Sequence, residues 1–426
     1  MIMMKKNIFC KTAIFFVLAS VFSCSQDPIF FKISTEPKPV KPHIQGSPTN
    51  IVMFERNSVP VMYVASGNLH WYAKANSGTG ASGWDSAEYG IPQPGGKVIG
   101  LAATDEYLYA LSIIDSGAAT ALRRIEPDKN EWENIPIAAD IKYTLIQTIF
   151  ADKDRLFAGA RNNSGSDFGI LYLVGGTLEL LEENTEMLSG AASRLETSGT
   201  FHYLSTRKGV YKVAAGASSA EQLKELVQKT DEDGNVYDEQ TEINRLFMGM
   251  IQLEDHDKTI IMIERNGGTL FEVREDGFKQ IRYSDGANVA SGRFSTGALA
   301  LWRQTILDED GQATANTYKR LVAGIQGGLY STTTSSSYTH GYVEFELSSD
   351  NGSLVLDGPR NINPDITVDG NTDRYTATIG KHPINHFFQA PESIDKNMIF
   401  FASTQTAGLW SYRRDREGGP QWNAEK

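Results

Sequence analysis

The chain has 426 residues, of which 40% are apolar and 22% charged, and its formal net charge is −12. This acidic balance argues against a nucleic-acid partner, because phosphate backbones demand a positively charged surface. Two cysteines are too few for a disulfide-stabilised scaffold, so stability must come from a hydrophobic core.

The first 23 residues have the pattern of a secretory signal. Lysines supply a positive start, and residues 14–22 supply an apolar stretch too short to span a bilayer. Residues 21–24, Val-Phe-Ser-Cys, resemble the lipobox of bacterial lipoproteins. The resemblance implies that a diacylglycerol is attached to the sulfur of Cys24 and that Cys24 becomes the first residue of the mature protein. The alternative is an ordinary cleaved signal with a chance cysteine at this place.

The mature protein is expected to hold no thiol for a disulfide, since Cys10 leaves with the signal and Cys24 is acylated. Removal of three lysines and no acid takes the net charge from −12 to −15. Two or more acyl chains anchor a protein stably where one is marginal. By resemblance to lipoprotein sorting, Ser25 after the cysteine implies the outer membrane rather than the inner one. The body would then face the periplasm or the outside.

Residues 24–49 are predicted to form a tether. They hold five prolines, and proline-rich chain extends by about 3.1 Å per residue. An apolar stretch, Ile29 to Ile33, interrupts the tether. This stretch either docks on the body as a strand or lies at the bilayer surface.

A short phrase recurs along residues 50–426: glycine, then Leu, Val or Ile, then an aromatic residue. Its copies begin at Gly67, Gly169, Gly209, Gly268, Gly328 and Gly408. Each copy follows a run of alternating apolar residues that ends at a turn, which is the signature of a β-hairpin. The aromatic side chains occupy the same place in each copy, so we expect them to pack between neighbouring sheets rather than to bind a ligand.

The body divides into seven units of four strand-like runs. In the fourth unit the last run is Leu223 to Val227, which reads either as a strand or as a helical turn. In the sixth unit the third and fourth runs are Leu329 to Thr333 and Tyr342 to Leu347. Four-stranded units cannot bury both faces alone, and a closed ring of them protects both ends. We therefore predict an all-β fold, a seven-bladed β-propeller with four-stranded antiparallel blades and a monomeric body.

Two segments carry the closest resemblance to a known repeat. Residues 321–330 and 400–410 resemble the hairpin of sensor-type and YVTN-like propeller repeats. The resemblance implies the propeller fold and no particular activity.

Long connections between runs are candidate binding loops. Residues 229–242 and 349–383 link a fourth run to the next first run, and therefore emerge on one face. Residues 305–317 and 334–341 are expected on the other face. We hypothesise that the first face recognises a partner.

Few residues in these connections are candidates for metal binding or catalysis. Asp231 to Asn235, Asp308 to Gln312 and Asp369 to Asn371 combine carboxylates with a glycine, which suits either a calcium loop or an exposed hairpin tip. None completes a calcium-loop pattern, so hairpin tips are favoured. His382 and His386 flank a proline, which excludes the helical two-histidine zinc motif. With seven histidines in all, we expect no metal site, no cofactor and no catalytic residues.

The sequence thus predicts a membrane-anchored envelope lipoprotein whose propeller binds or scaffolds an envelope protein without catalysis. The alternative is a carbohydrate-active hydrolase or lyase with its site in the propeller channel. Paired carboxylates in that channel would favour the enzyme, and an apolar or uncharged channel would favour the scaffold.

Overall fold

The computed structural model describes residues 44–425 except for 74–83, 85–89, 115–118, 196–198, 243–244, 254–258, 265–269, 275, 284–297, 308–312, 327–339, 351–352, 361–378, 380–381, 395–398 and 414–420. Contact clustering separates residues 1–41 from residues 42–426, and every described residue belongs to the second unit. The signal, Cys24 and the stretch from Ile29 to Ile33 lie outside the described residues. Within them, no helix has the length and apolar character needed to cross a membrane.

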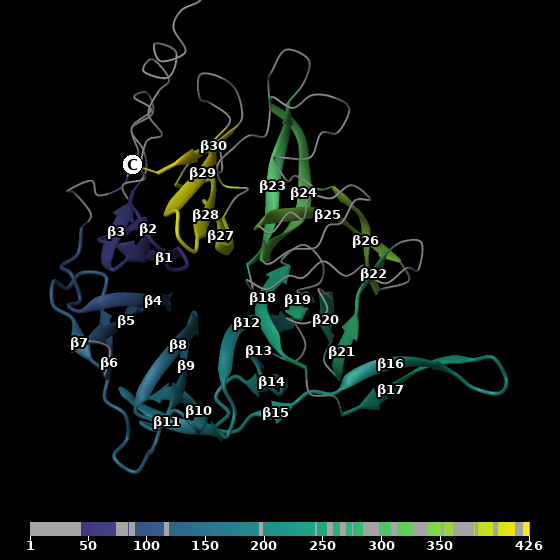
Figure 1. The fold of residues 1–426 in the computed structure, drawn as a ribbon, viewed down its shortest axis with the longest axis horizontal. Helices are drawn as coiled ribbons and strands as arrows, with labels where there is room; N and C mark the ends of the chain where they lie inside the picture. The colour runs from purple at the N-terminus through teal and green to yellow at the C-terminus, as the bar shows by residue number, and fades with distance from the viewer. Residues whose placement is uncertain are drawn as a thin grey trace, which may run out of the picture. The chain divides into compact units, whose positions relative to one another are not determined.

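The first four sheets are antiparallel and follow chain order (Figure 1). Sheet one contains β1 (Val52–Arg56), β2 (Val59–Ser66) and β3 (Asn68–Tyr72), and Trp84 adds a single bridge to Tyr72. Sheet two contains β4 (Lys97–Ala103), β5 (Leu108–Ile114), β6 (Ala119–Ile125) and β7 (Glu133–Asn134). Sheet three contains β8 (Leu145–Asp152), β9 (Arg155–Arg161), β10 (Phe168–Val174) and β11 (Thr177–Glu183). Sheet four contains β12 (Met187–Leu195), β13 (Gly199–Thr206), β14 (Gly209–Ala214) and β15 (Glu221–Gln222).

Sheets five and six carry extra strands at their outer edges. Sheet five contains β18 (Phe247–Leu253), β19 (Thr259–Glu264), β20 (Leu270–Arg274) and β21 (Gly277–Gln280), extended by β16 (Glu225–Thr230) and β17 (Val236–Thr241). Sheet six contains β23 (Leu299–Leu307), β24 (Ala313–Gln326), β25 (His340–Asp350) and β26 (Ser353–Arg360), extended by β22 (Arg282–Tyr283). Sheet seven contains β27 (Ile384–Gln389), β28 (Phe400–Thr404), β29 (Leu409–Arg413) and β30 (Gln421–Ala424).

Seven clusters of buried apolar side chains lie between consecutive sheets of the described chain. Each cluster draws on two neighbouring sheets, and the last one joins sheet seven back to sheet one. The first strands of sheets two to seven also contact one another in order. The sheets therefore close on themselves, and the prediction of an all-β, seven-bladed propeller is confirmed.

The closing contact uses residues that precede the first strand. Ile44 is fully buried in the cluster that joins sheets one and seven. The Leu409 amide donates to the Ile44 carbonyl at 3.0 Å, and the Gly408 amide donates to the Gly46 carbonyl at 3.0 Å. The Ser403 hydroxyl donates to the Thr49 carbonyl at 2.8 Å. The packed body thus begins at Ile44, inside the segment that the sequence assigns to the tether.

The recurring phrase marks the beginning of the third strand of its sheet. Its aromatic side chain is buried at Tyr172, Tyr211, Phe271 and Trp410, in clusters between neighbouring sheets. Trp71 is half-buried against the cluster between sheets one and two. These residues pack as the repeat predicts. The copy at 328–330 lies outside the described residues.

The last strand predicted for the fourth unit is wrong. The fourth strand is the short β15, and most of the run from Leu223 to Val227 lies in β16, which belongs to sheet five. Glu225 pairs in parallel with Phe278 of β21, and all of β16 pairs with β17. The apolar run extends the edge of a neighbouring sheet because Leu226 is buried there.

Sheet six corrects two further predictions. Strand β24 pairs directly with β25, so the run from Tyr342 to Leu347 lies in the third strand rather than the fourth. The fourth strand is β26, which takes up part of the predicted long connection 349–383. Of the connection predicted at 334–341, residues 334–339 lie outside the described residues, and residues 340–341 belong to β25.

An arginine ties sheet one to sheet two. Arg56 is buried, and its Nη1 donates to the carbonyls of Pro127 at 2.7 Å and Lys129 at 2.6 Å. We expect Arg56→Ala to lower the free energy of unfolding by roughly 2–3 kcal/mol, because a buried side chain and its charge-assisted bonds to two backbone carbonyls are lost. Arg56→Lys should recover only part of this loss, since an ammonium lacks the planar fork. Urea denaturation measures both, and an unchanged midpoint for Arg56→Ala would contradict the assignment.

Candidate functional site

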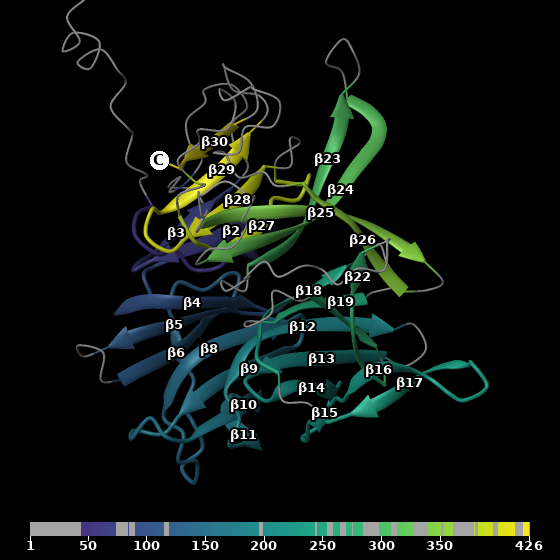
Figure 2. The ribbon, with the colours of Figure 1, turned by 45° about the vertical axis from the view of Figure 1, so that its right-hand side comes forward.

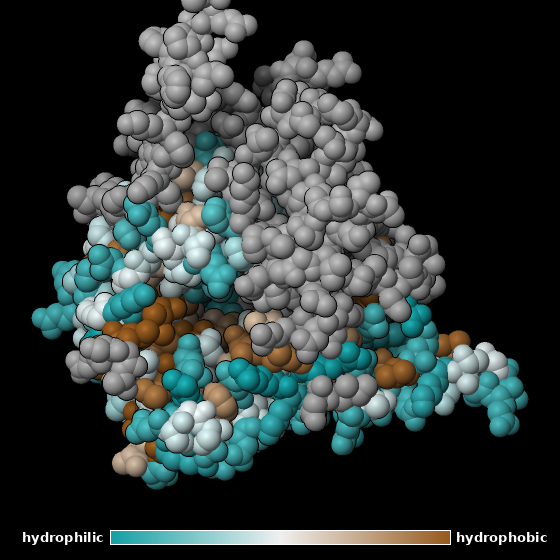
Figure 3. Space-filling model, viewed as in Figure 1, coloured by the Kyte–Doolittle hydropathy of each residue, from teal (hydrophilic) through white to brown (hydrophobic). Residues whose placement is uncertain are grey.

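The central cavity is lined by the innermost strands of sheets two to seven and by the residue range that leads into sheet one. It has a volume of about 320 Å³ and receives residues from β4, β8, β12, β18, β23 and β27, together with Asn50 just before β1. Most of these residues lie in the first half of their strand. Each inner strand begins where the connection from the preceding sheet ends. The cavity therefore lies toward the face that carries the connections between sheets. Figure 3 shows apolar side chains gathered over the inner strands from β4 to β12 on the viewed face.

Five inner strands carry a β-bulge at an equivalent position, the second or third residue of the strand. In each, the pairing with the second strand skips one residue near the start of the strand, and every skipped residue lines the cavity. These residues are Ile99, Gln147, Leu188, Met248 and Asn385. A bulge places one extra residue on its strand and redirects the side chain there. Sequence reasoning missed this arrangement, because the five residues share no chemical type.

The described lining of the cavity carries no carboxylate, lysine or arginine. Its polar groups are neutral: Asn50, Gln147, Thr148, Ser189 and Asn385. The His386 side chain is exposed to solvent, and desolvation by the surrounding strands lowers the pKa of its imidazole to about 4. His386 is therefore neutral at pH 7. The cavity suits an uncharged group rather than an ion.

A hairpin replaces the loop expected at residues 229–242. Strands β16 and β17 pair along their whole length, and β17 is the outermost strand of sheet five. Figures 1 and 2 both show the hairpin extending beyond β21. Val236 is 60% exposed and Tyr237 is 48% exposed, the two largest values among the big apolar side chains of the described chain. Among the described strands, the outer edge of β17 thus has no pairing partner, and apolar side chains lie at its outer end.

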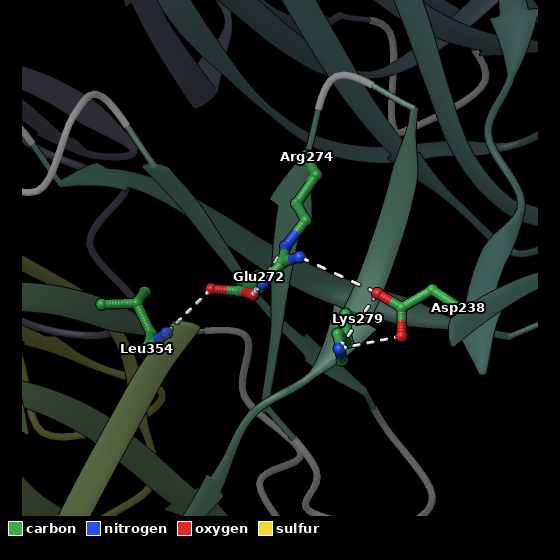
Figure 4. A network of polar contacts seen from close by, with 5 residues as sticks. All are labelled: Asp238, Glu272, Arg274, Lys279 and Leu354. Carbon is green, nitrogen blue, oxygen red and sulfur yellow. Dashed lines mark hydrogen bonds and ion pairs between the residues drawn. The ribbon is translucent and has the colours of Figure 1, made fainter. Parts of the chain in front are cut away.

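Ion pairs fix the base of the hairpin to sheet five (Figure 4). Lys279 Nζ lies 2.9 Å and 3.1 Å from the two carboxylate oxygens of Asp238. Arg274 lies between Asp238 and the buried carboxylate of Glu272, whose second oxygen accepts the Leu354 amide of sheet six at 3.1 Å. The network links the hairpin, sheet five and sheet six, so the exposed end projects from a fixed base.

The hairpin tip is the first of the three Asp-rich segments. Asp231 accepts hydrogen bonds from the amides of Asp233 at 3.0 Å and Asn235 at 2.8 Å. The bonds from Asn235 lower the pKa of Asp231. Gly234 has a φ of +85°, which closes the turn. The other two segments, Asp308 to Gln312 and Asp369 to Asn371, lie outside the described residues.

Comparisons with known proteins were made on sequence and on structure. No family model matches the chain, and no curated protein matches it. Solved structures do match. YCF48 bound to D1 peptide is 14% identical, with 90% of this chain and 98% of that chain covered and a TM-score of 0.44.

Enzyme-like propellers match equally well. A putative 6-phosphogluconolactonase from Bacteroides uniformis is 13% identical, with 89% of this chain and 95% of that chain covered and a TM-score of 0.44. An ancestral GH74 enzyme is 12% identical, with 90% of this chain and 47% of that chain covered and a TM-score of 0.48. These likenesses do not decide between binding and catalysis.

Proposed function

We propose that this chain is a lipid-anchored envelope protein whose propeller binds a protein partner through the β16–β17 hairpin. The observation that carries the proposal is the exposed edge of β17 with Val236 and Tyr237 beside it. An exposed strand edge pairs readily with an extended segment of another protein, and adjacent apolar side chains add affinity.

The charge of the hairpin indicates the kind of segment it accepts. Asp231, Glu232 and Asp233 are exposed at the tip, while Lys229 is already paired with Glu239. The excess of negative charge disfavours pairing with a second copy of the same hairpin. It favours an extended partner segment that combines apolar and basic residues.

The cavity supports binding over glycoside hydrolysis. Most glycosidases use two carboxylates that flank the scissile bond. The described lining of the cavity provides neutral side chains instead. The proposal therefore assigns no catalytic step to this cavity. Anchoring at Cys24, with the tether that precedes Ile44, would hold the hairpin near other envelope components and raise their effective concentration.

Site-directed photo-crosslinking in intact membranes tests the proposal. A photoreactive residue at position 237 should give a defined crosslinked product. The matched control is position 174, because Val174 is also exposed, at 39%, and lies at the connection between β10 and β11 on the opposite face. Equal crosslinking at both positions, or products from position 174 only, would contradict the proposal.

Side-chain truncation then measures the contribution of the apolar pair. With the crosslinked partner purified, we expect Val236→Ser combined with Tyr237→Ser to weaken binding at least about tenfold, because two apolar contacts are lost. Val174→Ser should leave the affinity unchanged. Isothermal titration calorimetry measures both. An unaltered Kd for the double variant would exclude these side chains from the interface.

A further inference from the structure

Two carboxylates and an imidazole converge between sheets three and four, away from the hairpin and the cavity. Asp152 ends β8, Asp154 lies in the turn between β8 and β9, and His202 lies in β13. His202 Nε2 is 3.8 Å from Asp152 Oδ2 and 4.0 Å from Asp154 Oδ1. One ligand atom from each residue lies within 4.8 Å of the other two.

These separations fit a cation better than direct hydrogen bonds. Nitrogen to oxygen hydrogen bonds span about 2.7–3.2 Å, shorter than both distances. Tetrahedral zinc holds imidazole nitrogen and carboxylate oxygen at about 2.0–2.2 Å, which places its ligand atoms roughly 3.4 Å from one another. The separations from His202 exceed this spacing by only about half an ångström, so small side-chain movements would bring the three groups to one ion.

The fold holds the imidazole firmly and leaves one side of the cluster open. The His202 side chain is fully buried, with its ring 5.2 Å from that of Phe157. Strand pairing places His202 between Ala192 and Val213. The Asp154 side chain is 74% exposed, which gives an ion and its water ligands a path from solvent.

The turn that carries both carboxylates is itself held in place. The Asp105 amide of sheet two donates to the Lys153 carbonyl at 2.7 Å. Directly after the turn, Arg155 donates to the Ala214 carbonyl of sheet four at 3.1 Å. Hydrogen bonds to both neighbouring sheets therefore position this turn before any ion binds.

We propose that Asp152, Asp154 and His202 bind a divalent transition-metal cation, with zinc the expected ion, which fastens sheet three to sheet four. A nitrogen ligand disfavours calcium and magnesium, which prefer all-oxygen sites, and suits zinc. Three protein ligands leave a fourth position for water. This proposal is independent of partner binding, and it departs from the expectation of no metal site.

The test uses the full-length, anchored protein in detergent, stripped with a chelator and titrated with zinc chloride. We expect one zinc per chain and a rise in Tm of roughly 2–4 °C at saturation. Asp154→Asn should weaken zinc binding at least about tenfold without changing the Tm of the metal-free protein, because the side chain is exposed. Asp140→Asn, at an exposed position elsewhere, is the matched control and should bind zinc like the wild type.

His202→Gln provides a second variant, and it should abolish the zinc-dependent rise in Tm. Absence of zinc binding by the wild type would overturn the proposal. So would equal zinc binding by the wild type and Asp154→Asn, because the ion would then lie elsewhere, for instance at the acidic hairpin tip. A larger stabilisation by calcium than by zinc would overturn the assignment of the metal class.

Discussion

Ile44→Asp is expected to lower the free energy of unfolding of the propeller by more than about 3 kcal/mol. Replacing a buried isoleucine by alanine alone costs about 2–5 kcal/mol, and the aspartate adds a buried charge. Ile44 is fully buried between sheets one and seven, so the loss falls on the contact that closes the ring.

Denaturation in guanidinium chloride, followed by tryptophan fluorescence, measures this loss. Trp84 lies in the same cluster as Ile44 and reports on it directly. Val174→Asp is the matched control, because it places the same charge at an exposed apolar position. Similar midpoints for the two variants would show that residue 44 does not contribute to closure.

Cys24→Ser is expected to move the protein from the membrane fraction to the soluble fraction. If Cys24 carries the lipid, a serine cannot accept the thioether-linked diacylglycerol, and the membrane affinity supplied by the acyl chains is lost. Cys10→Ser is the matched control, since it changes the only other cysteine of the chain and should leave anchoring intact.

Membrane fractionation with immunoblotting distinguishes these variants, and mass spectrometry of the amino-terminal peptide detects the lipid. Retention of Cys24→Ser in the membrane after a carbonate wash would contradict anchoring through Cys24. Loss of both variants from the membrane would show that changes in this region impair export rather than lipid attachment.

The sequence predicts the number and class of the sheets well, because inter-sheet packing imposes the same residue types in every repeat. Tyr172, Tyr211 and Trp410 each lie in a third strand and are buried there. The prediction is wrong where a strand leaves its unit. Leu226 is apolar as a fourth-strand residue should be, but pairing with β17 and β21 places its strand on the next sheet.

Sheet six shows a second physical limit of pattern reading. The runs Leu329 to Thr333 and Tyr342 to Leu347 are both strand-like, and alternation alone does not tell which of them pairs with β24. The register between Leu321 and Phe345 decides in favour of the second run.

The candidate sites depend on structural features that leave little trace in the neighbouring sequence. The bulges are aligned by the stacking of sheets, and Gln147 and Leu188 share a position without sharing chemistry. Asp152 and Asp154 are adjacent in sequence, whereas His202 reaches them only through the packing of sheet four on sheet three. The exposure of Tyr237 also requires knowledge that its strand is the last in the sheet.

The amino-terminal seam has a mechanical consequence. Residues 44 to 46 run alongside the loop before β29, and Gly46 bridges Ala407 in parallel. If lipid holds the amino end, a force along the tether acts first on the hydrogen bonds that Gly408 and Leu409 donate, and only then on the rest of the propeller. The anchored molecule would then open first where its amino-terminal residues contact sheet seven. Strengthening that contact would raise the force needed to unfold the protein.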